Sequence, residues 1–133
     1  MTRDREPLIL IVDDDPDFLA INRHILEKAG YRVATASEPA EALQSMAAQK
    51  PDLVITDYRM PNCSGESLIK AIREDPTFRT MKILVLSSHS EEELVERLGH
   101  YGLEGYLLKG QGMQTLVERV GEIVAGGSSE ADS

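Results

Sequence analysis

Short apolar runs alternate along this chain with longer segments whose apolar residues recur at helical spacing. The runs predict five strands, at residues 8–12, 31–34, 52–56, 82–86 and 105–108. Apolar runs that lack a polar alternation are typical of strands covered on both faces of a sheet.

The amphipathic segments between these runs predict helices. Asp15 is the expected N-cap of the first helix, with Pro16 at the first helical position, and Ser37 is the expected cap of the second. Ser90 and Glu93 form a capping box before the fourth helix. The third helix is expected over residues 66–73, and the last helix over residues 112–125.

The apolar residues of these helices recur at the spacing of one helix face. The residues expected to face the core include Ile21, Ala40, Leu68, Val95 and Leu116.

Regular alternation of strand and helix predicts an α/β fold, with a single five-stranded parallel sheet and helices on both faces. We expect one domain over residues 8–125. The polar segments 1–7 and 126–133 are predicted to be disordered. Ligands of such sheets bind at the carboxyl ends of the strands.

The acidic balance of the chain disfavours two classes of partner. Its formal net charge is −9 at pH 7, so nucleic acids and anionic membranes are repelled. Cys63 is the single cysteine, which precludes an internal disulfide and suits a reducing compartment. The sequence shows neither a signal-peptide pattern nor an apolar run of membrane length. We therefore expect a cytoplasmic protein without membrane insertion.

Residues with chemistry directly follow four of the predicted strands. Asp13 and Asp14 follow the first strand, Asp57 the third, Ser87 the fourth and Lys109 the fifth. Because the carboxyl ends of parallel strands share one edge of the sheet, we expect these side chains to converge. That convergence favours a site over the simpler interpretation that the aspartates only form turns.

Three carboxylates at one edge repel one another unless a cation lies between them. Oxygen ligands are typical of Mg²⁺, or of Mn²⁺ in its place. A bound cation also screens an incoming phosphoryl group, so that an aspartate can attack phosphorus. A lysine and a hydroxyl, here Lys109 and Ser87, would hold the phosphoryl oxygens. The set predicts phosphoryl transfer to a carboxylate.

Four segments resemble the receiver domains of two-component response regulators. They are IVDDDP at 11–16, ITDYRMPNCSG at 55–65, VLSSH at 85–89 and GYLLKG at 105–110. Each is weak alone, but the ordered set is specific and spans nearly the whole chain. The resemblance implies a flavodoxin-like (βα)5 fold with strand order 2-1-3-4-5. It also implies that a sensor histidine kinase or a histidine phosphotransfer protein supplies the phosphoryl group from a phosphohistidine.

The same resemblance assigns the residues of the phosphorylation site. Asp57 is the phosphoacceptor, and Lys109 contacts the phosphoryl group. Asp14 ligates Mg²⁺ directly, Asp13 assists partly through water, and the main-chain carbonyl of Arg59 completes the protein ligands together with Asp57.

Signalling and phosphoryl lifetime are assigned in the same way. Ser87 turns inward on phosphorylation, and Tyr106 is the aromatic switch residue that follows it. Arg59 and His89 occupy tuning positions, where we expect their bulk and charge to slow loss of the phosphoryl group to water. The sequence departs from the family at Gly110, where a proline in a cis peptide is usual. We expect a trans peptide before Gly110, because the cis form is costly without proline.

Other function classes fit the residues less well. Residues 13–15 form a D-x-D that resembles the haloacid-dehalogenase-type phosphohydrolases, but the later acidic pair of that family is missing and the chain is short. A calcium loop starting at Asp13 would need glycine and glutamate where Phe18 and His24 occur. A receiver-like interaction module that is not phosphorylated stays an open alternative, because of Gly110.

The resemblance also indicates how a signal leaves the domain. A protein target is expected to bind the face built from the fourth helix, the fifth strand and the fifth helix, biased by phosphorylation as a two-state shift. We expect no enzymatic activity beyond the domain's own phosphorylation and dephosphorylation. Two organisations stay open, a stand-alone receiver and the receiver of a longer chain.

Overall fold

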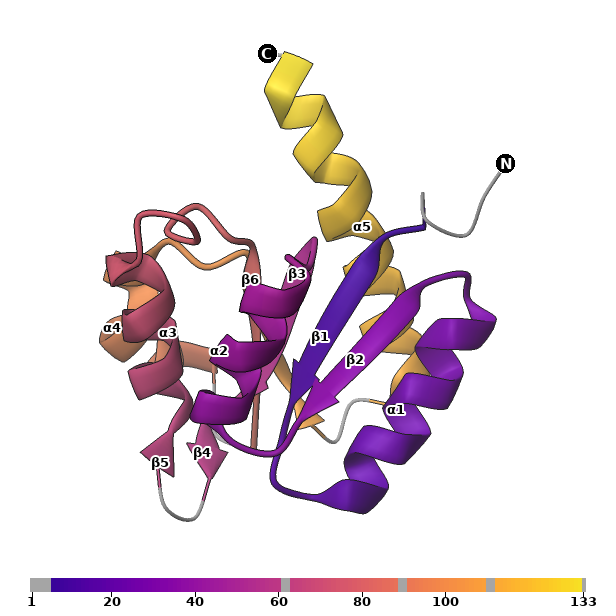
Figure 1. The fold of residues 1–133 in the computed structure, drawn as a ribbon, viewed down its shortest axis with the longest axis horizontal. Coiled ribbons are helices and arrows are strands. Elements are labelled where there is room, and N and C mark those ends of the chain that lie inside the picture. Colours follow the sequence, from indigo (N-terminus) through magenta and orange to yellow (C-terminus); the bar gives the residue numbers. More distant parts are fainter. Residues whose placement is uncertain (1–5, 61–62, 89–90, 110–111, 133) are drawn as a thin grey trace.

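The computed structural model describes residues 6–60, 63–88, 91–109 and 112–132, with the main chain alone at 59–60, 63–64, 91, 113 and 126–132. Five parallel strands form the main sheet (Figure 1). The order β2-β1-β3-β6-β7 confirms the predicted α/β fold and the strand order 2-1-3-4-5. The strands are β1 (Leu8–Val12), β2 (Arg32–Ala36), β3 (Leu53–Asp57), β6 (Ile83–Ser87) and β7 (Gly105–Leu108).

Helices cover both faces of this sheet, as predicted (Figure 1). One face carries α1 (Pro16–Lys28) and α5 (Met113–Asp132). The other carries α2 (Pro39–Ala48), α3 (Gly65–Glu74) and α4 (Glu91–Leu98), which continues into the 3₁₀ turn η2 (Gly99–Tyr101). The central strands are therefore shielded from water on both sides, which is why their sequences are mainly apolar.

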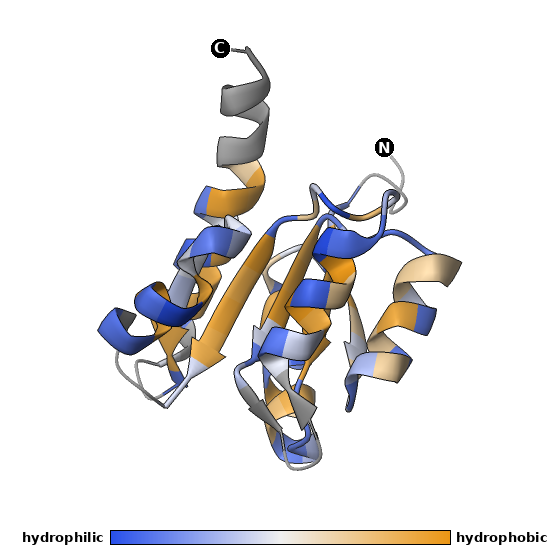
Figure 2. Cartoon of the chain, turned by 90° about the vertical axis from the view of Figure 1, so that its left-hand side faces the viewer, coloured by the Kyte–Doolittle hydropathy of each residue, from blue (hydrophilic) through white to orange (hydrophobic). Residues whose placement is uncertain are grey.

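The two apolar cores lie on opposite sides of the sheet. Ile9 and Ile11 of β1 point to the layer of α1 and α5, whereas Leu10 and Val12 point to the layer of α2, α3 and α4. This alternation is the twofold periodicity of a strand. Figure 2 shows hydrophobic strands between helices that carry both hydrophobic and hydrophilic residues.

The start of α1 confirms its predicted cap, whereas the predicted cap of α2 is wrong. Asp15 Oδ1 accepts hydrogen bonds from the main-chain N–H of Asp17 at 2.9 Å and of Phe18 at 3.4 Å. The N-cap of α2 is Glu38, one residue after Ser37, because Pro39 occupies the first helical position. Ser37 instead donates from its N–H and its hydroxyl to a Glu41 carboxylate oxygen, at 2.6 and 2.9 Å.

Three residues predicted to face the core are exposed instead. Ile21 is 50% exposed and Val95 is 45% exposed, and Ala40 also lies at the surface. Each of these helices buries a narrower apolar stripe than its sequence allows. In α4, for example, Leu94 and Leu98 fill the contact with the sheet, and their neighbour Val95 points away.

Two segments differ from their predicted structure. The predicted loop after β3 contains a short antiparallel hairpin, β4 (Arg59–Met60) and β5 (Cys63–Ser64). Helix α5 continues to Asp132, past the end predicted at residue 125, since no proline follows to stop it. The disorder of residues 126–133 in solution stays a prediction.

Candidate functional site

Three aspartates meet at the carboxyl edge of the sheet. Asp13 directly follows β1, where its N–H extends the ladder by donating to Ala36 O at 3.0 Å. Asp57 is the last residue of β3. Asp13, Asp14 and Asp57 each place a carboxylate oxygen within 4.8 Å of the others. The structure therefore brings together the carboxylates that the sequence places at separate strand ends.

The three carboxylates differ in their exposure to water. Asp13 and Asp57 are buried, with 1% and 7% of their surface exposed, whereas Asp14 is exposed. Asp13 Oδ1 accepts a hydrogen bond from Asp15 N at 2.9 Å. Its other oxygen, Oδ2, is buried and accepts no hydrogen bond from the described residues. Asp13 Oδ2 forms an ion pair with Lys109, whose Nζ lies 2.7 Å away.

Lys109 extends from the end of β7 across to these carboxylates. Its Nζ lies 2.7 Å from Asp13 Oδ2 and 3.4 Å from Asp57 Oδ2. Burial by itself would lower the pKa of Lys109, but its close contacts with the negatively charged carboxylates of Asp13 and Asp57 outweigh burial and raise that pKa above its usual value. The lysine therefore carries a positive charge next to Asp57 at neutral pH.

The two residues with predicted switch roles lie near this edge. Ser87 is buried at the end of β6, directly after Leu86, which pairs with Asp57 across the sheet. Tyr106 is half-buried in β7, opposite Val85, and packs against the core on the side of α4. Both positions fit the predicted roles, and the roles themselves stay predictions.

The donor set of this site fits a hard divalent cation. Asp13, Asp14 and Asp57 offer carboxylate oxygens from two strand ends, and oxygen is the ligand that Mg²⁺ prefers. Asp13 Oδ2 is buried, and its close partner among the described residues is the ammonium of Lys109, at 2.7 Å. A cation among these oxygens would reduce the repulsion between the carboxylates.

Other predicted site features lie outside the description or only partly within it. The main chain of Arg59 belongs to β4, whereas its side chain is not described. The predictions for His89 and for the peptide before Gly110 lie outside the described residues, as does the cap predicted at Ser90.

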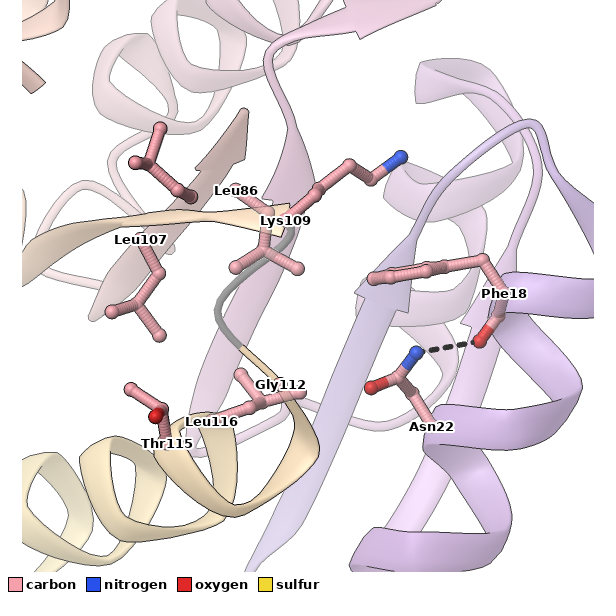
Figure 3. A pocket seen from close by; sticks show the side chains of 9 residues that line it. Phe18, Asn22, Leu86, Leu107, Lys109, Gly112, Thr115 and Leu116 are labelled. Atoms are coloured by element: carbon pink, nitrogen blue, oxygen red, sulfur yellow. Dashed lines mark hydrogen bonds between the residues drawn. The ribbon is translucent and has the colours of Figure 1, made fainter. Parts of the chain in front are cut away.

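Two residues near Lys109 have positions that the sequence did not indicate. The ring of Phe18 lies under the lysine ammonium, with its centroid 4.5 Å from Nζ (Figure 3). Asn22, one turn further along α1, is fully buried and donates from Nδ2 to Phe18 O at 2.8 Å. The helical pattern of α1 predicts that Phe18 faces inward, but it does not indicate a contact with a residue of β7.

The sequence of residues 9–121 matches the family model of the response regulator receiver domain. The chain belongs to this family. As a receiver domain, it is a module of two-component signal transduction.

Known proteins resemble this receiver domain in sequence and in fold. It is 37% identical over 120 residues to the sensor histidine kinase TmoS of Ectopseudomonas mendocina, covering 90% of this chain and 12% of that protein. It is 36% identical over 128 residues to the transcriptional regulatory protein PrrA of Mycobacterium tuberculosis, and this match covers 96% of this chain and 54% of that protein. The chemotaxis response regulator CheY4 of Vibrio cholerae superposes with a TM-score of 0.82 at 29% identity, covering 89% of this chain and 98% of that one.

The receiver domain thus corresponds to part of these relatives, 12% of one protein and 54% of another. Within the described residues, no helix combines the length and the apolar character that crossing a membrane requires.

Proposed function

We propose that Asp57 accepts a phosphoryl group from a phosphohistidine of a sensor histidine kinase or a histidine phosphotransfer protein. The observation that carries this proposal is the contact of Lys109 Nζ with Asp57 Oδ2 at 3.4 Å, at the edge where Asp13 and Asp14 also converge. This arrangement places an acceptor carboxylate, a fixed positive charge and a set of oxygen ligands within one site.

The reaction transfers one phosphoryl group between two side chains. A carboxylate oxygen of Asp57 attacks phosphorus, and the P–N bond to the partner's imidazole breaks. Its electron pair stays on the imidazole nitrogen, which then takes a proton from water. The product is an acyl phosphate on Asp57, which water later hydrolyses. The domain promotes only its own phosphorylation and dephosphorylation, so it is not an enzyme that turns over a separate substrate.

Mg²⁺, or Mn²⁺ in its place, is the cofactor that these residues suit. Asp13, Asp14 and Asp57 would hold it, together with the main-chain carbonyl of Arg59. When bound, it supplies positive charge that screens the phosphoryl oxygens from the carboxylates. Lys109 supplies the second positive charge and holds a phosphoryl oxygen, and the hydroxyl of Ser87 binds another when it turns inward.

The downstream partner is proposed to be a protein that binds the face formed by α4, β7 and α5. Val95 on α4 and Leu108 on β7 are large apolar residues with 45% and 38% of their surface exposed. Together with Tyr106, they would make this face sensitive to the state of Asp57 through a shift between two conformations. The acidic chain is not expected to bind nucleic acid itself, and we expect the domain to act in the cytoplasm.

Incubation with Mg²⁺ and acetyl phosphate, followed by intact-mass measurement, tests the central step. The parent should gain the mass of one phosphoryl group, and Asp57→Asn should gain none. Asp15→Asn is the matched control, because asparagine also caps a helix, and it should be phosphorylated like the parent. A parent without an adduct would favour the interaction module that is not phosphorylated. An adduct that persists in Asp57→Asn but disappears in Asp13→Asn would favour the phosphohydrolase.

A further inference from the structure

The ammonium of Lys109 lies over an aromatic ring as well as beside two carboxylates. Its Nζ is 4.5 Å from the centroid of the Phe18 ring. Figure 3 shows Lys109 reaching from the end of β7 toward α1, with the ring below its terminal nitrogen. A cation at this distance over a ring face is attracted by the negative face of the ring. The lysine is therefore held from the α1 side as well as from the sheet.

The turn of α1 that carries Phe18 is fixed at both ends. The main-chain N–H of Phe18 donates a hydrogen bond to Asp15 Oδ1 at 3.4 Å. The carbonyl oxygen of Phe18 accepts one from Asn22 Nδ2 at 2.8 Å. The N–H of Asp15 in turn donates to Asp13 Oδ1 at 2.9 Å. Hydrogen bonds thus connect a carboxylate of the site to the turn that holds the ring, so the position of the ring is set relative to Asp13.

Asn22 is an unusual residue at its place in the core. It is fully buried, and its Oδ1 accepts no hydrogen bond from the described residues. A cavity of about 20 Å³ is lined by Asn22, Phe18, Lys109 and Thr115, among others, which is room for one water molecule. An apolar residue would avoid the unsatisfied acceptor. It would also lose the bond from Nδ2 to Phe18 O, which is a reason for an amide at this position.

We propose that Phe18 is a positioning residue for Lys109, and that Asn22 holds the turn of α1 that carries the Phe18 ring. The ring attracts the ammonium without adding a negative charge that would compete with the phosphoryl group. Without the ring, the ammonium would lose its attraction on the α1 side, and the lysine side chain would spend less time where it can reach a phosphoryl group on Asp57. This proposal rests on the proposed function, because Lys109 matters for the rate only if Asp57 is phosphorylated.

Two substitutions at one position separate the aromatic face from simple packing. Phe18→Leu keeps an apolar side chain but removes the ring, and it should slow phosphorylation of Asp57 by acetyl phosphate by about two- to fivefold. Phe18→Tyr keeps the ring and should restore the parent's rate. Ile21→Ala, at a 50% exposed position of the same helix, is the control and should leave the rate unchanged.

A double variant tests whether Phe18 acts through the lysine. In a Lys109→Met background, Phe18→Leu should cause no further loss of rate. The NMR shift of the Lys109 ε-methylene reports the contact directly, because a nearby ring shields it. That shielding should be lost in Phe18→Leu, retained in Phe18→Tyr and reduced in Asn22→Leu.

The outcomes are distinct. Three results would overturn the proposal. The first is a phosphorylation rate in Phe18→Leu equal to that of the parent, and the second is an equal loss of rate from Phe18→Leu in the Lys109→Met background. The third is a Lys109 ε-methylene shift that does not change when Phe18 is replaced. If Phe18→Leu does not fold, Phe18→Met and the NMR shift in the parent decide the same question. A parent that takes no phosphoryl group refutes the proposed function instead, while the methylene shift still shows whether the ring holds the lysine.

Discussion

Lys109 is closer to Asp13 than to Asp57, with Nζ–Oδ2 distances of 2.7 and 3.4 Å. The lysine is thus paired most closely with a carboxylate that we propose as a metal ligand. Asp13 is almost fully buried, so the lysine also neutralises a charge that water cannot reach.

Lys109→Met should destabilise the metal-free domain. Without the ammonium, the buried Asp13 Oδ2 loses its charged partner, a loss of about 1–3 kcal/mol. Urea unfolding in the presence of a chelator measures the change. Lys70→Met, at an exposed lysine of α3, is the control and should stay close to the parent. Equal stabilities of Lys109→Met and Lys70→Met would contradict this expectation.

Mg²⁺ should stabilise the fold through the three carboxylates. A ligand that binds only the folded state at a concentration a hundredfold above its Kd adds about 2.7 kcal/mol. Asp14→Asn should abolish most of the rise in Tm with Mg²⁺, because it removes an exposed ligand without disturbing the core. Asp17→Asn, which alters an exposed carboxylate on α1, should keep the rise. A rise retained in Asp14→Asn would remove this residue from the metal site.

Gly65→Ala should disturb the acceptor itself. A Cβ on Gly65 would overlap the main-chain oxygen of Asp57, which cannot move without moving the strand end. Overpacking of this kind costs about 1–3 kcal/mol, and phosphorylation of Asp57 should slow as well. The matched control is Gly99→Ala, where the nearest atom to an added Cβ is a Val95 methyl at 4.0 Å. The prediction fails if Gly65→Ala matches Gly99→Ala both in its unfolding curve and in the mass assay.

The contact of Glu41 with Ser37 should make stability depend on pH in the acid range. The hydrogen bond from the Ser37 main chain, then that from its hydroxyl, lowers the pKa of Glu41 below 4.5. A carboxylate with a lowered folded-state pKa contributes stability above its unfolded pKa and loses it as the pH falls through the folded value. The parent should therefore exceed Glu41→Gln in stability at pH 7, and the gap should close below pH 4.5.

Glu38→Gln is the control for that comparison, because the side chain of Glu38 makes no capping hydrogen bond to α2. Glu38→Gln should leave the contact between Ser37 and Glu41 in place. A gap between parent and Glu41→Gln that is unchanged in acid would show that the Ser37 contact does not form in solution.

The sequence alone was sufficient to predict the strands of the sheet and the residues that meet at its carboxyl edge. Strands buried on both faces need continuous apolar runs, so β1, β3 and β6 were evident from composition along the chain. Parallel strands carry their carboxyl ends to one edge, so the positions of Asp13, Asp57 and Lys109 directly after strands predicted their meeting.

Only the tertiary structure decided which partners these residues take. The preference of Lys109 for Asp13, and the ring of Phe18 beneath its ammonium, depend on how closely α1 packs beside β7. Ile21 and Val95 fit a helical stripe in sequence but are exposed, because packing uses only part of each stripe. Periodicity fixes the face on which a side chain lies, whereas distances between elements follow from the packing of all the side chains between them.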